Sequence, residues 1–136
     1  MAAGDVDQIP SGIRIHLTNF GHLVAEIVGG HVDYARFSYP QNRMIESTEG
    51  QIPPGAKVMP GAASEFAVIV DTPKLAARDR DSVERGMQGL AINGAIQFKT
   101  GFDSTDSLPI HFTYDPQEKR WVHVNEGTRV DLRSAK

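Results

Sequence analysis

Hydrophobic and polar residues alternate with a period of two in several parts of the chain, which is the pattern of half-buried β-strands. Residues 13–19 show it most clearly, because Ile13, Ile15 and Leu17 occupy every second position and polar side chains lie between them. One face of this segment is therefore expected to pack on a core while the other faces solvent.

Two later segments also predict strands. Residues 89–100 alternate again, with Gly94 at a position that suits a bulge or the close approach of another backbone. Residues 64–70 are apolar almost throughout, which predicts a core strand covered on both faces.

The middle of the first half reads as a hairpin. The β-prone runs 23–28 and 31–39 flank Gly29 and Gly30, and paired glycines suit a turn that needs positive φ. Pro40 then ends the second strand.

Loops and one short helix are expected between residues 41 and 85. Residues 41–50 are polar enough for a loop, with at most a short pairing at Met44 and Ile45, and the two Pro-Gly pairs that follow predict turns. Thr72 and Pro73 suit the start of a helix over residues 74–85, although the apolar stripe there is thin and a loop is the alternative.

A C-terminal hairpin is predicted from runs 108–114 and 120–124, joined by an Asp-Pro turn. A five-residue loop would place His111 directly opposite His123 and put Trp121 on the polar face. In that register the two imidazoles could share a metal ion or repel each other when protonated, so His111 and His123 are candidate metal ligands or a pH switch.

These elements favour an all-β fold, a two-sheet antiparallel β-sandwich of about six to eight strands with at most one short helix. A small β-barrel is the alternative. The length of 136 residues suits a single domain, with residues 1–12 and 126–136 as loosely held tails apart from a short strand at 129–132.

Charge, cysteine content and the absence of common motifs disfavour several classes of function. The formal charge of −3 and the lack of a dense Lys/Arg run disfavour nucleic acid as a partner. The chain contains no cysteine and opens without a signal-peptide pattern, which favours a cytoplasmic protein and leaves non-classical secretion open. No phosphate-binding glycine loop and no Gly-x-Ser-x-Gly motif occurs, so the expectation leans away from an enzyme and no cofactor is expected.

Aromatic residues are the remaining candidates for a site. Tyr34, Tyr39, Tyr114 and Trp121 combine an apolar body with a polar tip, a chemistry that suits lipid headgroup interfaces and sugar stacking. They are the predicted ligand-binding residues.

The first half of the chain resembles the aegerolysin family of small acidic β-sandwich proteins, within the wider actinoporin-like group. The resemblance lies in IRIHLTNFG (13–21) and in EGQIPPGAKV (49–58), which together cover less than half of the chain. Those proteins are rich in Trp and carry an aromatic, cysteine-bearing motif in their second half, whereas this chain has Trp121 alone and no cysteine. The resemblance implies lipid recognition and assembly with a larger pore-forming partner, and it assigns no residues.

The leading hypothesis is therefore a non-enzymatic binding module for a membrane lipid or a glycan. One alternative is a structural, self-assembling β-subunit, a homo-oligomer or particle component whose edge strands associate. The other is a small metal- or pH-dependent protein that uses His111 and His123.

Overall fold

Nine strands and one short helix make up the part of the chain that the computed structural model describes, residues 1–9, 12–61, 66–101 and 104–124. The strands are β1 (Ala2–Ile9), β2 (Gly12–Thr18), β3 (Ala25–Ser38), β4 (Arg43–Gln51), β5 (Lys57–Val58), β6 (Phe66–Asp71), β7 (Gln88–Thr100), β8 (Asp106–Asp115) and β9 (Arg120–His123). The helix is α1 (Ala77–Glu84).

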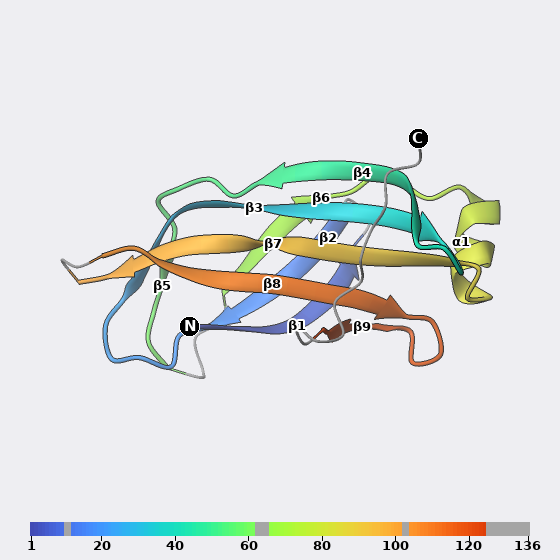
Figure 1. The fold of residues 1–136 in the computed structure, drawn as a ribbon. Helices are drawn as coiled ribbons and strands as arrows, with labels where there is room; N and C mark the ends of the chain where they lie inside the picture. The colour runs from blue at the N-terminus through green and yellow to red at the C-terminus, as the bar shows by residue number, and fades with distance from the viewer. Residues whose placement is uncertain (10–11, 62–65, 102–103, 125–136) are drawn as a thin grey trace.

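The strands form two antiparallel sheets, as the sequence predicts. The smaller sheet has the order β1-β2-β6, and the larger has the order β4-β3-β7-β8-β9, with β5 pairing with one end of β3. In Figure 1 the smaller sheet crosses behind the larger one at an angle, and α1 lies at one end of the pair. Among the described strands none of one sheet pairs with a strand of the other, so the fold is the sandwich and not the barrel.

The core lies between the facing sides of the sheets. Ile13, Ile15 and Leu17 of β2 are at most 1% exposed, which confirms the predicted alternation. They pack in one cluster with side chains of the larger sheet, among them Ile92 and Ile110. Burial of these side chains is the main stabilising contribution to the fold, at roughly 25 cal/mol per Å² of apolar surface.

Two strands form where loose chain was expected. The prediction of a tail over residues 1–12 is wrong, because β1 pairs with β2 and buries Val6 in the core. The prediction of a loop over residues 41–50 is also wrong, because β4 pairs with β3 along nearly its whole length. Both are edge strands whose backbone hydrogen bonds compensate for a weak side-chain pattern. The expected tail at 126–136 and the strand at 129–132 lie outside the described residues.

The predicted hairpin at Gly29 and Gly30 is wrong, because β3 continues through both residues. A bulge lies between Ile27 and Gly29 in the pairing with β7. A Cβ at Gly30 would lie 2.4 Å from the carbonyl oxygen of Ala95, so this glycine allows two backbones to approach closely.

Gly94 fulfils the predicted role of close approach, since a Cβ there would lie 2.1 Å from the carbonyl oxygen of His31. The prediction that residues 64–70 are covered on both faces is wrong for residues 66–70, while residues 64 and 65 lie outside the described residues. β6 is an edge strand of the smaller sheet, and its Ile69 is 57% exposed while Val70 is buried. A continuous apolar run thus does not imply two covered faces in a three-stranded sheet.

The helix is shorter than the range proposed from sequence. It begins at Ala77, after the predicted start at Thr72 and Pro73, and Ala76 precedes it without a side-chain cap. Only Val83 of α1 is buried, in agreement with the thin apolar stripe. No helix in the described ranges is long and apolar enough to cross a membrane.

Candidate functional site

The C-terminal hairpin is one residue out of the predicted register. Phe112 lies opposite His123, and Tyr114 lies opposite Trp121. The loop is four residues long, 116–119. It is held by Asp115, whose Oδ1 accepts hydrogen bonds from the backbone nitrogens of the second and third loop residues at 2.9 and 3.4 Å.

This register turns Trp121 towards the core. The indole is only 6% exposed, so the expected position on a polar face is wrong. Residues that face each other across an antiparallel pair share a side of the sheet, and Trp121 therefore lies on the same side as the buried Phe112. Burying an indole removes more apolar surface from water than burying Val122, which is the physical reason for this choice.

The same shift separates the two candidate histidines. His111 faces Asn93 across the β7–β8 pair, with Nδ1 at 3.1 Å from the Asn93 side-chain oxygen. His123 shares the face of Phe112, against which its ring packs edge-on at 5.2 Å. The opposed pair on which the metal and pH-switch hypothesis rested is therefore absent. In the described ranges no group of three or more His, Cys, Asp or Glu is arranged to hold a metal ion.

A cavity of about 630 Å³ opens at the end of the sandwich that carries α1. Both sheets contribute to its walls, together with α1 and the segment that leads into it. The lining residues are Val6, Asp7, Tyr34, Thr72, Pro73, Lys74, Leu75, Arg80, Val83, Glu84, Leu90, Tyr114, Lys119, Arg120 and Trp121. This volume falls within the range of small-molecule sites, roughly 300–1,000 Å³.

Three of the four predicted aromatic residues line this cavity. Tyr34 comes from β3, Tyr114 from β8 and Trp121 from β9, so the fold joins segments that are almost 90 residues apart in the chain. Tyr114 and Trp121 contact edge-on with ring centroids 5.8 Å apart. Tyr39 is not part of the cavity: it ends up beyond β3, 46% exposed, with its ring against Phe37.

We call Tyr34, Tyr114 and Trp121 the aromatic floor of the cavity. Two of its polar groups are shielded from water. The Nε1–H of Trp121 is buried and has no hydrogen-bond acceptor among the described residues. Burial raises the pKa of Tyr34 to about 12, with a further increase from nearby Glu46 and a partial offset from Arg36. Tyr34 therefore keeps its proton at neutral pH and presents a neutral hydroxyl group.

Basic side chains dominate the charged part of the lining. Lys74, Arg80, Lys119 and Arg120 all line the cavity and are all exposed. Only Arg120 has an acidic partner among the described residues, the nearby Glu118. This local positive charge contrasts with the net charge of −3 on the whole chain.

The two carboxylates of the lining already have partners. Asp7 lies 2.6 Å from Nε2 of His16, and Glu84 accepts a hydrogen bond of 3.1 Å from the Tyr114 hydroxyl. Burial, followed by the proximity of Glu84, raises the pKa of Tyr114. The lining as a whole carries four basic and two acidic side chains, a formal excess of two positive charges.

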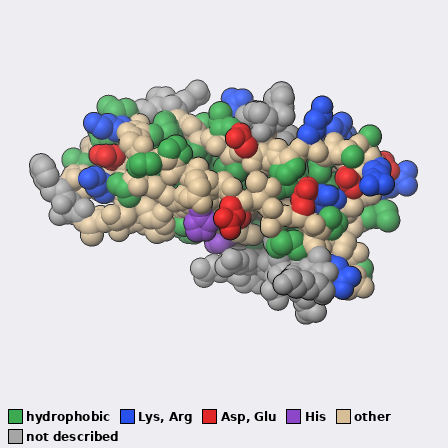
Figure 2. Space-filling model, turned by 90° about the horizontal axis from the view of Figure 1, so that it is seen from above, with side chains coloured by type: hydrophobic (Ala, Val, Ile, Leu, Met, Phe, Trp, Pro, Cys, Tyr) green, Lys and Arg blue, Asp and Glu red, His purple; other side chains and the backbone are tan. Residues whose placement is uncertain are grey.

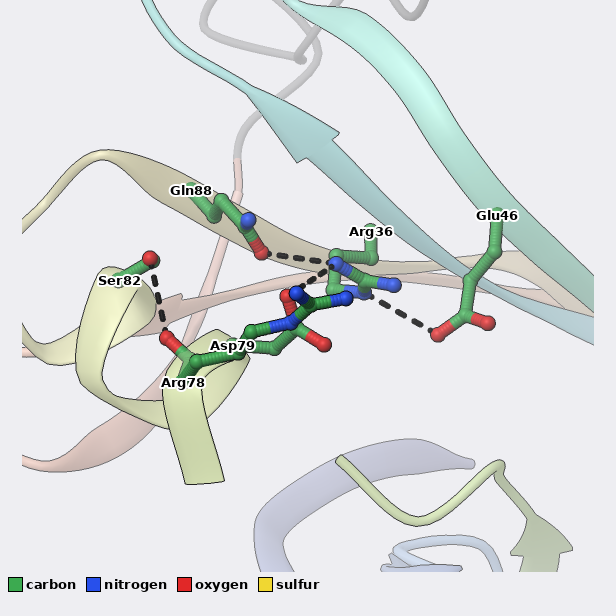
Figure 3. A network of polar contacts seen from close by, with 6 residues as sticks. All are labelled: Arg36, Glu46, Arg78, Asp79, Ser82 and Gln88. Carbon is green, nitrogen blue, oxygen red and sulfur yellow. Dashed lines mark hydrogen bonds and ion pairs between the residues drawn. The ribbon is translucent and has the colours of Figure 1, made fainter. Parts of the chain in front are cut away.

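A partly buried arginine connects α1, and with it one wall of the cavity, to the larger sheet. Arg36 lies at the centre of the network in Figure 3. Its guanidinium contacts Glu46 of β4 at 3.1 Å, Asp79 of α1 at 3.2 Å and the Gln88 side chain at 2.9 Å. Because its side chain is only 11% exposed, these contacts are well shielded from solvent.

Sequence reasoning did not identify the basic rim. Lys74 precedes the helix, Arg80 lies within it, Lys119 ends the last turn and Arg120 begins β9. Acidic and basic residues alternate around α1 in the sequence, so no local excess of positive charge is visible there. No local motif marks the rim, since only the tertiary fold places these side chains around one opening.

Comparisons with known proteins give no family for this chain. Neither a scan of protein-family models nor searches of curated proteins and of solved structures returned a match. The likeness to aegerolysins therefore stays a prediction from two short segments, and the site has to be interpreted from its own chemistry.

Proposed function

We propose that this protein is a non-enzymatic binding module whose cavity takes one small amphipathic anion. The apolar body of the ligand lies against Tyr34, Tyr114 and Trp121, and a carboxylate or phosphate head lies at the basic rim. A cluster of basic side chains above an aromatic floor, in a chain of net charge −3, is the observation that carries the proposal.

The floor suits an apolar body. Besides the aromatic rings it contains Leu75, Val83 and Leu90, which offer hydrocarbon surface without hydrogen-bonding groups. A hydrocarbon chain or an aromatic ring gains free energy on leaving water for such a surface, about 0.8 kcal/mol for each methylene group buried.

The rim suits an anionic head. Arginine presents a planar fork that binds carboxylate or phosphate oxygens in pairs, and lysine adds a mobile positive charge. Lys74, Arg80 and Lys119 are not engaged by an acidic residue among those described, so binding an anion would break no existing ion pair at these three side chains.

These features favour a lipid-derived ligand over a glycan, the two classes suggested by the aromatic residues. A neutral sugar needs several donors and acceptors around its hydroxyl groups. The floor itself offers the Tyr34 hydroxyl and the Trp121 Nε1–H, and most other polar groups of the lining are charged side chains, which suit an anionic head better than a neutral hydroxyl group. An alkyl carboxylate or phosphate leaves fewer of its own polar groups without partners.

Calorimetric titration with amphiphiles that differ in the head tests this function. Decanoate and decyl phosphate are compared with decanol and decyl glucoside, which have the same chain length, all below their aggregation concentrations. We expect the anions to bind with one-to-one stoichiometry and at least about tenfold more tightly than the neutral amphiphiles. Equal affinity for all heads, or tightest binding of the glucoside, would contradict the proposal and favour a sugar ligand.

Self-assembly is a second candidate, because β4 lies at the edge of the larger sheet. Its nine residues alternate between exposed and half-buried positions, and Ile45 is 42% exposed. An edge strand of this length can pair with a second copy. Sedimentation velocity over a wide concentration range tests this candidate: a reversible dimer that Ile45→Lys abolishes supports it, whereas a monomer at every concentration excludes it.

A further inference from the structure

The end of the molecule opposite α1 carries a cluster of exposed apolar side chains. Phe20 is 69% exposed, Leu23 58% and Val24 36%, all from the connection between β2 and β3. Met59, next to β5, is 55% exposed. In Figure 2 hydrophobic and basic side chains gather at the left-hand end, where Figure 1 places β5. We call these four residues the apolar tip.

A row of charged residues lies one step behind the apolar tip. Glu26 of β3 pairs with Lys57 of β5 on one side and with Lys99 of β7 on the other. Opposed residues share a face, so the row reads Lys, Glu, Lys across three strands. Continuing both pairings by two residues brings Val24 and Met59 onto the same face. All five side chains line one shallow hollow of about 410 Å³.

Hydrogen bonds of Asn19 anchor the loop that carries the apolar tip. Asn19 is the buried polar residue of the described core, at 2% exposure. Its side-chain amide donates to the carbonyl oxygens of Leu23 and Val58 at 2.8 and 3.1 Å, and its Oδ1 accepts from the Gly21 backbone nitrogen at 3.0 Å. The backbone oxygen of Asn19 also accepts from Gly61. These hydrogen bonds favour the loop conformation in which the apolar side chains are exposed.

We infer that the apolar tip is a membrane-docking surface for bilayers that contain anionic phospholipid. Phe20, Leu23 and Met59 enter the interface, while Lys57 and Lys99 remain at the level of the headgroup phosphates. The surface is separate from the cavity near α1, and the inference does not rest on the proposed ligand.

The distance between the charged row and the exposed residues Val24 and Met59 supports a bilayer as the partner. Two residues along a strand span about 7 Å. Peripheral segments bury their apolar face about 5–10 Å into the boundary between headgroups and acyl chains. When Val24 and Met59 are at that depth, the row of Lys57, Glu26 and Lys99 lies among the headgroups, and its net positive charge complements an anionic leaflet.

Co-sedimentation with vesicles tests this inference on the full chain. Vesicles of phosphatidylcholine alone are compared with vesicles that contain about one-third phosphatidylserine, at low and at physiological salt. We expect binding to the anionic vesicles that weakens with salt. The double variant Phe20→Ser/Leu23→Ser lowers the partition coefficient about tenfold or more. Each of Lys57→Gln and Lys99→Gln lowers it about fivefold on anionic vesicles.

Met87 provides a matched control, because it is as exposed as Met59, at 59% against 55%. Met59→Ser should weaken vesicle binding and Met87→Ser should leave it unchanged, with the folded state of both variants verified by circular dichroism. Absence of binding to any vesicle would overturn the inference. So would equal effects of the two substitutions, or a dimer in solution that the Phe20→Ser/Leu23→Ser variant dissociates, since a second copy would then be the occupant.

Discussion

Tyr114 and Trp121 face each other across the last hairpin, with ring centroids 5.8 Å apart, and together they form part of the cavity floor. The pair also connects the hairpin to the helix, because the Tyr114 hydroxyl donates to Glu84 of α1. The cavity thus depends on the register of one hairpin, and a shift by one residue would turn both rings to the other side of the sheet.

Trp121→Phe should separate binding from stability. The substitution keeps an aromatic wall but presents a smaller ring to the apolar body of the ligand, so we expect affinity for decanoate to fall about fivefold to tenfold. Stability to urea should fall by about 1–2 kcal/mol, because a smaller ring fills the site. Trp121→Ala serves as the contrast and should cost about 3 kcal/mol or more. Unchanged affinity in the folded Phe variant would remove Trp121 from the site.

Side-chain periodicity identified most of the fold but not its register. The alternation around Ile13 and Ile15 predicted β2, and the apolar phase around Gly94 predicted β7 with its close backbone approach. The glycines at 29 and 30 misled the prediction, because a glycine that permits a bulge has the same sequence signal as one that permits a turn.

The site was only partly predictable for a related reason. The aromatic candidates could be named from chemistry, and Tyr34, Tyr114 and Trp121 do meet around one cavity. The faces of the last hairpin could not be assigned correctly, since four-residue and five-residue loops both suit the Asp-Pro turn and only burial of Trp121 decides between them. The basic rim depends on long-range packing and leaves no local pattern.

Loss of the Arg36 network should loosen α1. Arg36→Ala leaves Asp79 and Glu46 without their shielded partner, so we expect urea stability to fall by about 2–4 kcal/mol. Arg85→Ala is the matched control, because its ion pair with Asp81 is largely exposed and should contribute less than about 0.5 kcal/mol. Similar losses in the two variants would show that Arg36 contributes no more than a surface ion pair.

Tyrosine ionisation should be displaced to high pH in the folded protein. Burial raises the pKa of Tyr34 from 10.0 to about 12, and it raises the pKa of Tyr39 as well. The folded state holds the Tyr34 proton more tightly than the unfolded state does. The contribution of protonated Tyr34 to the stability of the folded state is therefore fully present below pH 10 and is lost as pH rises from 10 towards 12.

Near-ultraviolet absorbance of tyrosinate, recorded before unfolding sets in, measures this displacement. Tyr34→Phe should remove the last ionisation step and should reduce the loss of urea stability above pH 10. A titration in which all the tyrosines ionise together near pH 10 would contradict the buried position of Tyr34.

Gly94→Ala should be severely destabilising, because the new Cβ would lie 2.1 Å from the His31 carbonyl oxygen and would force β3 and β7 apart. We expect a loss of about 3 kcal/mol or more in thermal or urea unfolding. Gly4→Ala is the control, since its Cβ would meet its nearest neighbour at 3.7 Å, an ordinary contact. Tolerance of both substitutions would contradict the close pairing at the centre of the larger sheet.

Contact quenching of Trp121 tests the central claim most directly, because the chain contains no other tryptophan. Titration with ω-bromodecanoate should quench its emission saturably, decanoate should reverse the quenching, and bromodecanol should quench only at concentrations about tenfold higher. Lys74→Gln/Arg80→Gln should remove this preference for the acid, and Lys57→Gln/Lys99→Gln at the far end should retain it. Absence of quenching, or equal quenching by the bromo-acid and the bromo-alcohol, would contradict an anion-binding cavity at Trp121.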